Sequence, residues 1–204
     1  MTSYHLMRAS QLVVATHNAN KFKEFSNLIK PFGIITISSG ELKLPEPEET
    51  ANTFAGNATI KAQKAAYITN LPALADDSGL CVTAINGAPG IYSSRWAGSN
   101  KDFTSAMERI NNYIKDKEDR TAWFMCVLCL ALPTGQTWYF EGRIDGQIVW
   151  PPRGNHGHGY DPIFQPKGEI QTFAEMTNSK KNSISHRAQA FHAFRTSCLE
   201  EHIP

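Results

Sequence analysis

A short apolar run at residues 72–75 leads directly into two adjacent carboxylates, Asp76 and Asp77, which are followed by Ser78 and Gly79. An apolar run bounded by turn residues is typical of a buried strand, and the end of such a strand is where an α/β protein presents functional groups. Two neighbouring carboxylates repel each other, so a fold that keeps them together usually supplies a cation or a shared proton. The alternative interpretation of the same residues is a solvated turn.

The rest of the chain alternates between strand-like and helix-like patterns. Apolar runs indicate strands at residues 11–15, 34–37, 80–85, 122–132 and 136–149, the last two joined by a hairpin at residues 133–135. Helical spacing indicates helices at residues 21–29, 53–68 and 102–114 and after Ser185, with Thr50 or Asn52 near the start of the second. We therefore expect an α/β fold with helices on the faces of a mixed sheet, in a single domain over residues 1–204, with residues 1–10 as a flexible N-terminal extension.

Composition narrows the classes of partner. The chain has 20 Lys and Arg against 19 Asp and Glu, a net charge of +1, so no broad positive field attracts nucleic acid or an anionic membrane. No segment approaches the roughly 20 apolar residues of a membrane span, and residues 1–10 lack the apolar core of a signal peptide. We expect a cytoplasmic protein that binds neither nucleic acid nor membrane.

The four cysteines do not form the framework of a secreted disulfide protein, which also favours the cytoplasm. Cys126 and Cys129 make a C-x-x-C pair, which invites a metal or redox interpretation. They lie inside the apolar run 122–132, however, and residues three apart on a strand point to opposite faces. We interpret both thiols as small core residues.

A turn between the first strand and the first helix could bind an anion. It reads Thr16-His17-Asn18-Ala19-Asn20-Lys21. Backbone N–H groups at the start of a helix and a lysine in its first turn both favour a phosphate. The glycines of a Walker A loop are missing. The alternative is an ordinary helix start capped by Asn18 or Asn20.

Acidic residues suggest a cation. Glu48 and Glu49 precede the second long helix, and Asp76 and Asp77 follow the middle strand. Oxygen ligands from separate loops suit Mg²⁺, which is commonly completed by water and substrate phosphates, while the lack of histidine and cysteine there disfavours zinc. The glutamates can also be read as a solvated acidic run.

Two later segments carry groups suited to a nucleotide. In Gly157-His-Gly-Tyr-Asp-Pro162, the glycines allow a ligand close to the backbone, and His158 and Tyr160 are flat enough to stack on a base. Lys181, His186 and Arg187 lie around the start of the last helix, where cations oppose the helix dipole and gain nothing as helix stabilisers. A ligand and plain solvent exposure both remain open for them.

These residues resemble the motifs of the inosine triphosphate pyrophosphatase family, the HAM1-like pyrophosphatases of non-standard purine nucleoside triphosphates. The matching motifs are Thr16-x-Asn18-x-x-Lys21; Glu49-Thr50 before Asn57-Ala58-x-x-Lys61-Ala62; Asp76-Asp-Ser-Gly-Leu80; Gly87-Ala-Pro-Gly-Ile-Tyr-Ser93 with Arg95; Gly159-Tyr-Asp-Pro162; and Ser185-His-Arg187. They occur in the order of the family, and together they are highly specific.

The resemblance implies a homodimeric cytoplasmic enzyme with an elongated sheet, two lobes and a central substrate cleft. It also implies hydrolysis of ITP, dITP and XTP to the monophosphate and pyrophosphate with Mg²⁺, which cleanses the nucleotide pool. Matched by residue, it assigns the triphosphate to residues 16–21, the metal to Glu49, Asp76 and Asp77, proton acceptance to Asp77, a substrate contact to Ser78, and the nucleotide, chiefly its base, to His158, Gly159, Tyr160, Asp161, Lys181, His186 and Arg187.

One residue departs from the family pattern. Many relatives have a phenylalanine where this chain has His158, and an imidazole offers less apolar area for stacking and can gain a charge. The division of work between Asp76 and Asp77 is open at this point. The competing functions are a pyrophosphatase for other modified nucleotides and a nucleotide-binding module without catalysis.

Overall fold

The computed structural model describes residues 4–199, and the chain divides into two compact units. Unit 1 comprises residues 1–77, 127–141 and 190–204, and unit 2 comprises residues 78–126 and 142–189. The single pyrophosphatase domain expected over residues 1–204 stays a prediction.

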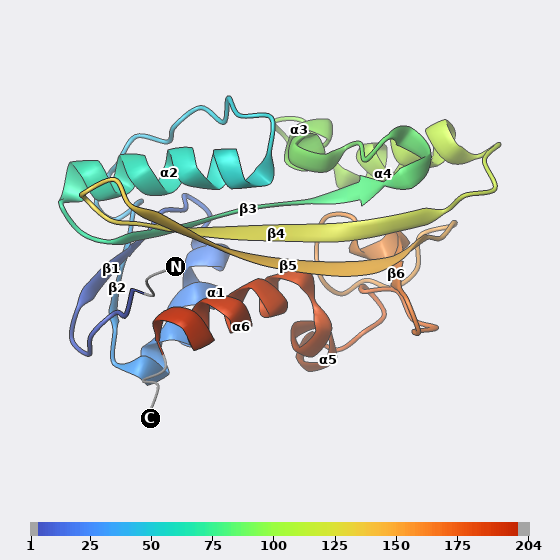
Figure 1. Cartoon of the computed structure of the whole chain (residues 1–204). Helices are drawn as coiled ribbons and strands as arrows, with labels where there is room; N and C mark the ends of the chain where they lie inside the picture. The colour runs from blue at the N-terminus through green and yellow to red at the C-terminus, as the bar shows by residue number, and fades with distance from the viewer. Residues whose placement is uncertain (1–3, 200–204) are drawn as a thin grey trace. The chain divides into compact units, whose positions relative to one another are not determined.

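Unit 1 is built on two consecutive β-α-β connections (Figure 1). Its elements are, in chain order, β1 (Gln11–Val14), α1 (Ala19–Ile29), β2 (Ile35–Ser38), α2 (Phe54–Thr69) and the first part of β3 (Ala73–Val82). β1 pairs in parallel with both β2 and β3 and therefore lies between them. The connection from β1 to β2 and the connection from β2 to β3 run in opposite directions across the sheet. Because such crossovers are right-handed, α1 and α2 cover opposite faces of the strands.

The strands join one mixed sheet in the order β2-β1-β3-β4-β5-β6, which confirms the predicted sheet with helices on its faces. Two long strands, β4 (Thr121–Ala131) and β5 (Thr137–Ile148), form the predicted hairpin. In its turn, the backbone N–H of Leu132 donates to the carbonyl of Gln136 at 2.9 Å. Like β3, both strands continue from one unit into the other.

β3 is longer than the sequence pattern predicts, which corrects the interpretation of Asp76 and Asp77 as a turn at the end of a strand. Both lie in the middle of a ten-residue strand, and the two residues are only 3% and 7% exposed. Successive side chains on a strand point to opposite faces. The two carboxylates therefore have different surroundings, although they are neighbours in sequence.

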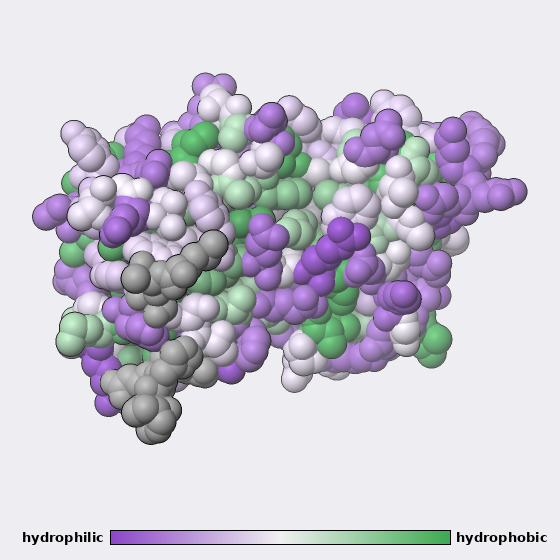
Figure 2. All heavy atoms as spheres, in the orientation of Figure 1, coloured by the Kyte–Doolittle hydropathy of each residue, from purple (hydrophilic) through white to green (hydrophobic). Residues whose placement is uncertain are grey.

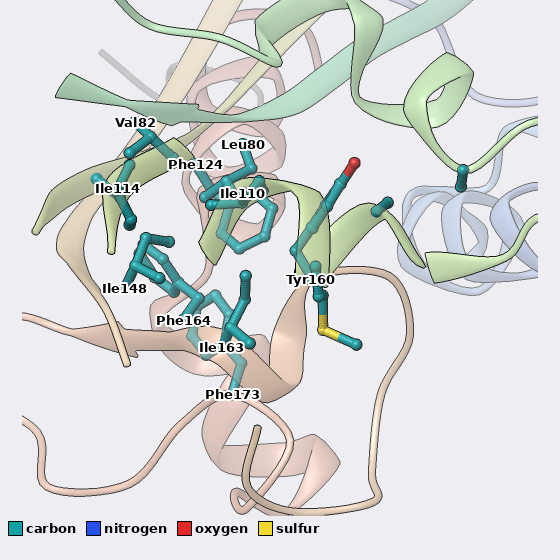
Figure 3. Packing of buried hydrophobic residues seen from close by; sticks show 14 of the residues in the cluster. Leu80, Val82, Ile110, Ile114, Phe124, Ile148, Tyr160, Ile163, Phe164 and Phe173 are labelled. Carbon is teal, nitrogen blue, oxygen red and sulfur yellow. The ribbon is translucent and has the colours of Figure 1, made fainter. Parts of the chain in front are cut away.

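Unit 2 holds a separate hydrophobic core (Figure 3). Its elements include α3 (Ser93–Trp96), α4 (Phe103–Ile114), β6 (Phe164–Pro166), α5 (Asn178–Ile184) and the first turn of α6 (His186–Cys198), together with short 3-10 turns at Thr83–Ile85, Gly90–Tyr92 and Asp161–Ile163. β6 pairs antiparallel with β5. Ile110, Phe124, Phe164 and Phe173 are among the buried side chains of this core. The core anchors the loop that carries His158 to Asp161.

One hydrophobic cluster of unit 1 is made mostly of small residues, among them the alanines of α2. This packing confirms the predicted helix but corrects its cap. The helix is capped by Thr53, whose side chain accepts a hydrogen bond from the N–H of Gly56 at 3.0 Å, and not by Thr50 or Asn52. Thr53 takes this place because its backbone is extended and its hydroxyl reaches the first turn.

The cysteines are core residues, as predicted. Cys126 and Cys129 are 0% exposed, and they form no disulfide in the part of the chain that the structure describes. Burial raises the pKa of the Cys129 thiol to about 11, so it stays protonated near neutral pH. The C-x-x-C pair is therefore a packing feature.

The N-terminal residues that the structure describes pack within unit 1. Tyr4 stacks on Trp138 with 5.3 Å between ring centroids, and the N–H of Leu6 donates to the carbonyl of Cys198 at 2.9 Å. Residues 1–3 of the predicted flexible extension lie outside the described residues. The face seen in Figure 2 is largely polar, with small apolar areas. Within residues 4–199, no helix has the length and apolar character needed to cross a membrane.

Candidate active site

Asp76 is held by a lysine of the predicted phosphate-binding turn. The Nζ of Lys21 lies 2.7 Å from Oδ2 of Asp76, whose side chain is 3% exposed. Lys21 is in the first turns of α1, so this ion pair ties the start of α1 to the middle of β3. A buried carboxylate needs such a partner to remain charged. The structure thus brings together two of the residues that sequence analysis placed in separate clusters.

Asp77 has different partners, two of which lie on α2. Its Oδ2 accepts a hydrogen bond from the side-chain amide of Asn57 at 3.1 Å, and its Oδ1 lies 4.0 Å from Nζ of Lys61. Burial raises the pKa of Asp77 to about 6; the Lys61 charge and the Asn57 hydrogen bond oppose the increase, while Glu49 and Asp76 add to it. This carboxylate can therefore exchange a proton close to neutral pH.

Lys61 links Asp77 to Glu49. Its Nζ lies 2.5 Å from Oε1 of Glu49, and its side chain is 15% exposed. Burial by itself would lower the pKa of Lys61, but the carboxylates of Asp76, Asp77 and Glu49 outweigh it, so the pKa lies above its usual value. Lys61 is therefore a fixed positive charge between two carboxylates.

Asn57 and Lys61 belong to a family motif, but the sequence by itself indicates no role for them. A signal was present, because positions i and i+4 of a helix lie on the same face. That face of α2 packs on the strand that carries Asp77. The same geometry separates the two glutamates, since Glu48 is exposed whereas Glu49 contacts Lys61.

The donor set suits a hard cation only in part. Glu49 and Asp77 provide carboxylate oxygens around Lys61, which matches the chemistry of Mg²⁺. Within residues 4–199, however, no three His, Cys, Asp or Glu side chains lie close enough to hold a metal ion by themselves. A cation at this cluster would need further oxygens, and Mg²⁺ usually obtains these from water and substrate phosphates.

The predicted phosphate-binding turn has the geometry of a helix start. The carbonyl oxygen of the Asn18 side chain accepts from the N–H of Lys21 at 3.2 Å, and the N–H of Asn18 donates to the hydroxyl oxygen of Thr16 at 3.2 Å. His17 contacts the carbonyl of Leu44 through Nε2 at 2.9 Å. The turn is therefore ordered by its own side chains, with Asn18 in the capping position that sequence analysis considered.

Three further members of the predicted site are Ala19, Asn20 and Ser78. Ala19 is the first residue of α1 and offers a ligand only its backbone polar groups. The side chain of Asn20 lies outside the described part of the structure. Ser78 follows Asp77 in β3 and is half-buried. Their contacts to a substrate stay predictions.

In unit 2, Asp161 organises the glycine-rich loop. Its Oδ2 accepts from the N–H of His158 at 2.8 Å and forms an ion pair with Nζ of Lys181, and its side chain is 5% exposed. Gly157 has φ +76°, and a Cβ there would overlap the Asp161 carboxylate, so only glycine fits. Gly159 and the exposed His158 follow in the same loop. Asp161 thus fixes both the loop backbone and the Lys181 ammonium.

Tyr160 corrects one interpretation of this loop. The residue is 3% exposed and its ring packs edge-on against Phe103 with 5.3 Å between centroids, so it belongs to the core and is not presented for base stacking. His186 is also buried, and its ring stacks on Phe124 at 4.8 Å. Arg187 is half-buried on the next position of α6. The sequence alone could not show which aromatic rings are buried in the core.

A buried carboxylate with a raised pKa beside lysines is the kind of cluster found in α/β enzymes. A model of the Ham1 family matches residues 12–197, and the chain belongs to this family. It is 54% identical over 195 residues to a dITP/XTP pyrophosphatase of Gluconobacter oxydans, covering 96% of this chain and 94% of that protein. A dITP/XTP pyrophosphatase of Bradyrhizobium sp. is 47% identical and covers 98% of this chain and 100% of its own length.

Solved structures agree with this assignment. The structure of a HAM1 protein from Coxiella burnetii is similar with a TM-score of 0.88 and 40% sequence identity, and the match covers 92% of this chain and 97% of that one. The predicted family and the mixed sheet with flanking helices are therefore confirmed.

Proposed function

We propose that this protein hydrolyses ITP, dITP and XTP to the monophosphate and pyrophosphate, and so removes non-standard purine nucleotides from the nucleotide pool. One observation carries the proposal. This protein has a buried aspartate, Asp77, with a pKa of about 6 beside Lys61, and its relatives bear the name dITP/XTP pyrophosphatase. Such a carboxylate can accept a proton from water near neutral pH.

In the proposed mechanism, Asp77 takes a proton from the attacking water while the oxygen of that water bonds to the α-phosphorus. The bond from the α-phosphorus to the oxygen that bridges to the β-phosphorus breaks, and pyrophosphate leaves with the electron pair. Lys21 and the N–H groups of residues 16–21 bind the triphosphate, and Lys61 keeps Asp77 and Glu49 in place. Ser78 contacts the substrate next to Asp77.

Mg²⁺ is the cofactor of the proposed reaction. The resemblance assigns it to Glu49, Asp76 and Asp77. Of these, Glu49 and Asp77 lie around Lys61, and together with phosphate oxygens they would hold an ion that would neutralise charge on the leaving pyrophosphate. Within this set, Asp77 and Glu49 share Lys61, whereas Asp76 is paired with Lys21. The division favours Asp77 as the proton acceptor, because Asp76 has a cation in direct contact.

The loop and helix start of unit 2 would recognise the base. Hypoxanthine and xanthine carry an O6 acceptor where adenine has an amino donor. Lys181, His186 and Arg187 can donate hydrogen bonds to O6. The amino group of adenine would face these donors with another donor and leave them unpaired, and a site of this kind can discriminate between the two bases by about 10⁴ or more. His158 is the proposed stacking residue. The proposed enzyme acts as a homodimer in the cytoplasm.

Pyrophosphate release tests this function. The purified protein is assayed with ITP, dITP, XTP, ATP, GTP and a panel of modified pyrimidine triphosphates, each with Mg²⁺ and with a chelator. Release from ITP, dITP and XTP, with Mg²⁺ only, is expected. Activity confined to modified pyrimidines would favour the other pyrophosphatase, and binding of ITP without release would favour the non-catalytic module.

A pair of variants completes the test. Lys181→Met should raise the KM for ITP while leaving the much slower reaction with ATP nearly unchanged, because only ITP offers O6 to the ammonium. Lys180→Met is the matched control, since its Nζ is bound to Glu169 at 2.6 Å on the surface. Equal ITP/ATP ratios in the Lys181 variant and wild type would remove Lys181 from base recognition.

A further inference from the structure

Ser93 is a buried serine at the end of the motif Gly87 to Ser93, to which the proposed mechanism gives no role. The residue is 7% exposed, and its side chain makes hydrogen bonds in two directions. The hydroxyl oxygen accepts from the backbone N–H of Leu80 at 2.9 Å, and the hydroxyl donates to the carbonyl of Gly90 at 2.7 Å. Ser93 thereby supplies a backbone group of β3 with a partner that comes from a side chain and not from a neighbouring strand.

The backbone of β3 approaches the same segment closely. A Cβ at Gly79 would overlap the carbonyl oxygen of Gly90 and lie 2.6 Å from Oγ of Ser93, so no larger residue fits there without displacing the turn. The N–H of Val82 also donates to the carbonyl of Ala88 at 3.1 Å. This part of β3 begins just after Asp77 and Ser78. The Gly87 to Ser93 segment therefore fixes the strand directly beyond the candidate base.

The backbone of Ser93 has a second buried partner. The hydroxyl of Tyr160 donates to the carbonyl of Ser93 at 2.8 Å. In Figure 3 the Tyr160 hydroxyl points away from Phe173 and the rest of the labelled cluster. Burial raises the pKa of Tyr160, so this hydroxyl remains a donor at any pH of interest. Tyr160 itself is the neighbour of Asp161, which holds His158 and Lys181.

We propose that Ser93 and Tyr160 are positioning residues that couple the loop at residues 157–161 to β3 beside Asp77 and Ser78. The link runs from the loop through the Tyr160 hydroxyl to the Ser93 carbonyl, and from the Ser93 hydroxyl to Leu80. Both residues are buried. The inference rests on the proposed function, because it assigns the loop to the base and β3 to the chemistry.

Hydrogen exchange tests the link without reference to activity. Tyr160→Phe removes only the hydroxyl and keeps the ring in the core, and it should speed exchange of the amides in the peptide around Leu80. Ser93→Ala should in turn speed exchange at residues 157–161. Matched controls are Ser94→Ala and Tyr113→Phe, which change exposed residues of α3 and α4. Faster exchange limited to the segment that carries each substitution would overturn the proposal.

Kinetics gives a second, independent measurement. Each single variant should lower kcat/KM for ITP by about 10-fold per folded molecule, since one hydrogen bond of about 1.4 kcal/mol is lost or misplaced. The double variant should lose no more than about 10-fold, because both changes break one link. Independent losses that multiply to about 100-fold, or no loss in Tyr160→Phe, would refute the link. A wild-type protein that releases no pyrophosphate would refute only the proposed function, and the exchange experiment would still test the link.

Discussion

Asp77→Asn should make the protein more stable while removing most of its activity. The pKa of Asp77 is raised from 3.8 to about 6 in the folded protein, chiefly by burial. Folding therefore opposes the charged form, and a shift of about two pKa units corresponds to about 3 kcal/mol. Asparagine has nearly the same shape and carries no charge, so the variant avoids this cost. Turnover should fall on the order of 10²-fold or more, as for loss of a general base.

The effect has a defined pH dependence. Between pH values of about 4 and 6, the folded state binds more protons at Asp77 than the unfolded chain does, so wild-type stability falls as the pH rises through this window and then levels off. The variant lacks this loss. The variant's free energy of unfolding should exceed that of wild type by up to about 3 kcal/mol above pH 7. The difference should vanish below about pH 4, where wild-type Asp77 is protonated in both the folded and the unfolded state.

Thermal and urea unfolding in the presence of a chelator measure the difference without interference from a bound cation. For a chain of this length, about 3 kcal/mol corresponds to a rise in Tm of about 6–12 °C. Asp145→Asn is the matched control, because this strand aspartate is 57% exposed and its replacement should change little. An Asp77→Asn variant no more stable than wild type at pH values of about 7 to 8, or equally stabilised near pH 4, would refute the reasoning.

Three further predictions follow from the same contacts. Lys61→Met should raise the pKa of Asp77 further and lower kcat by on the order of 10-fold or more, measured as pyrophosphate release across pH, because two carboxylates lose their common cation. Asp161→Asn should increase the KM for ITP more than it lowers kcat, since Lys181 loses its partner. Replacing Cys126 and Cys129 together by alanine should lower stability by about 1 kcal/mol per site, measured in urea, and leave turnover and metal content unchanged.

The order of strands and helices could be predicted because each element carries a strong local pattern. Apolar runs and helical spacing place β1, α1, α2, α4 and the β4–β5 hairpin to within a few residues of where the structure has them. The length of β3 could not be predicted in this way. Two aspartates in a row look like a solvated turn, but inside the strand they have partners, Lys21 and Asn57, that are distant in sequence.

The same limit applies to the candidate site. Lys21, Glu49, Asp76 and Asp77 were predicted as members of a site, and the structure brings them together around β3. Lys61 was not assigned, since a lysine on an alanine-rich helix resembles a solvated residue until its neighbours are known. Tyr160 was interpreted as a stacking group because a sequence shows the ring but not the core around it.

Strand geometry explains how one pair of adjacent acids can serve two purposes. On β3, Asp76 faces the start of α1 and Asp77 faces α2, as their hydrogen bonds to Lys21 and Asn57 show. Asp76 has a direct ion pair with Lys21 at 2.7 Å, whereas Asp77 is 4.0 Å from Nζ of Lys61 and burial raises its pKa to about 6. A proton acceptor must be able to hold a proton near neutral pH, which the raised pKa of Asp77 allows. In the proposed mechanism, the division of roles therefore reflects which face of the strand each carboxylate occupies.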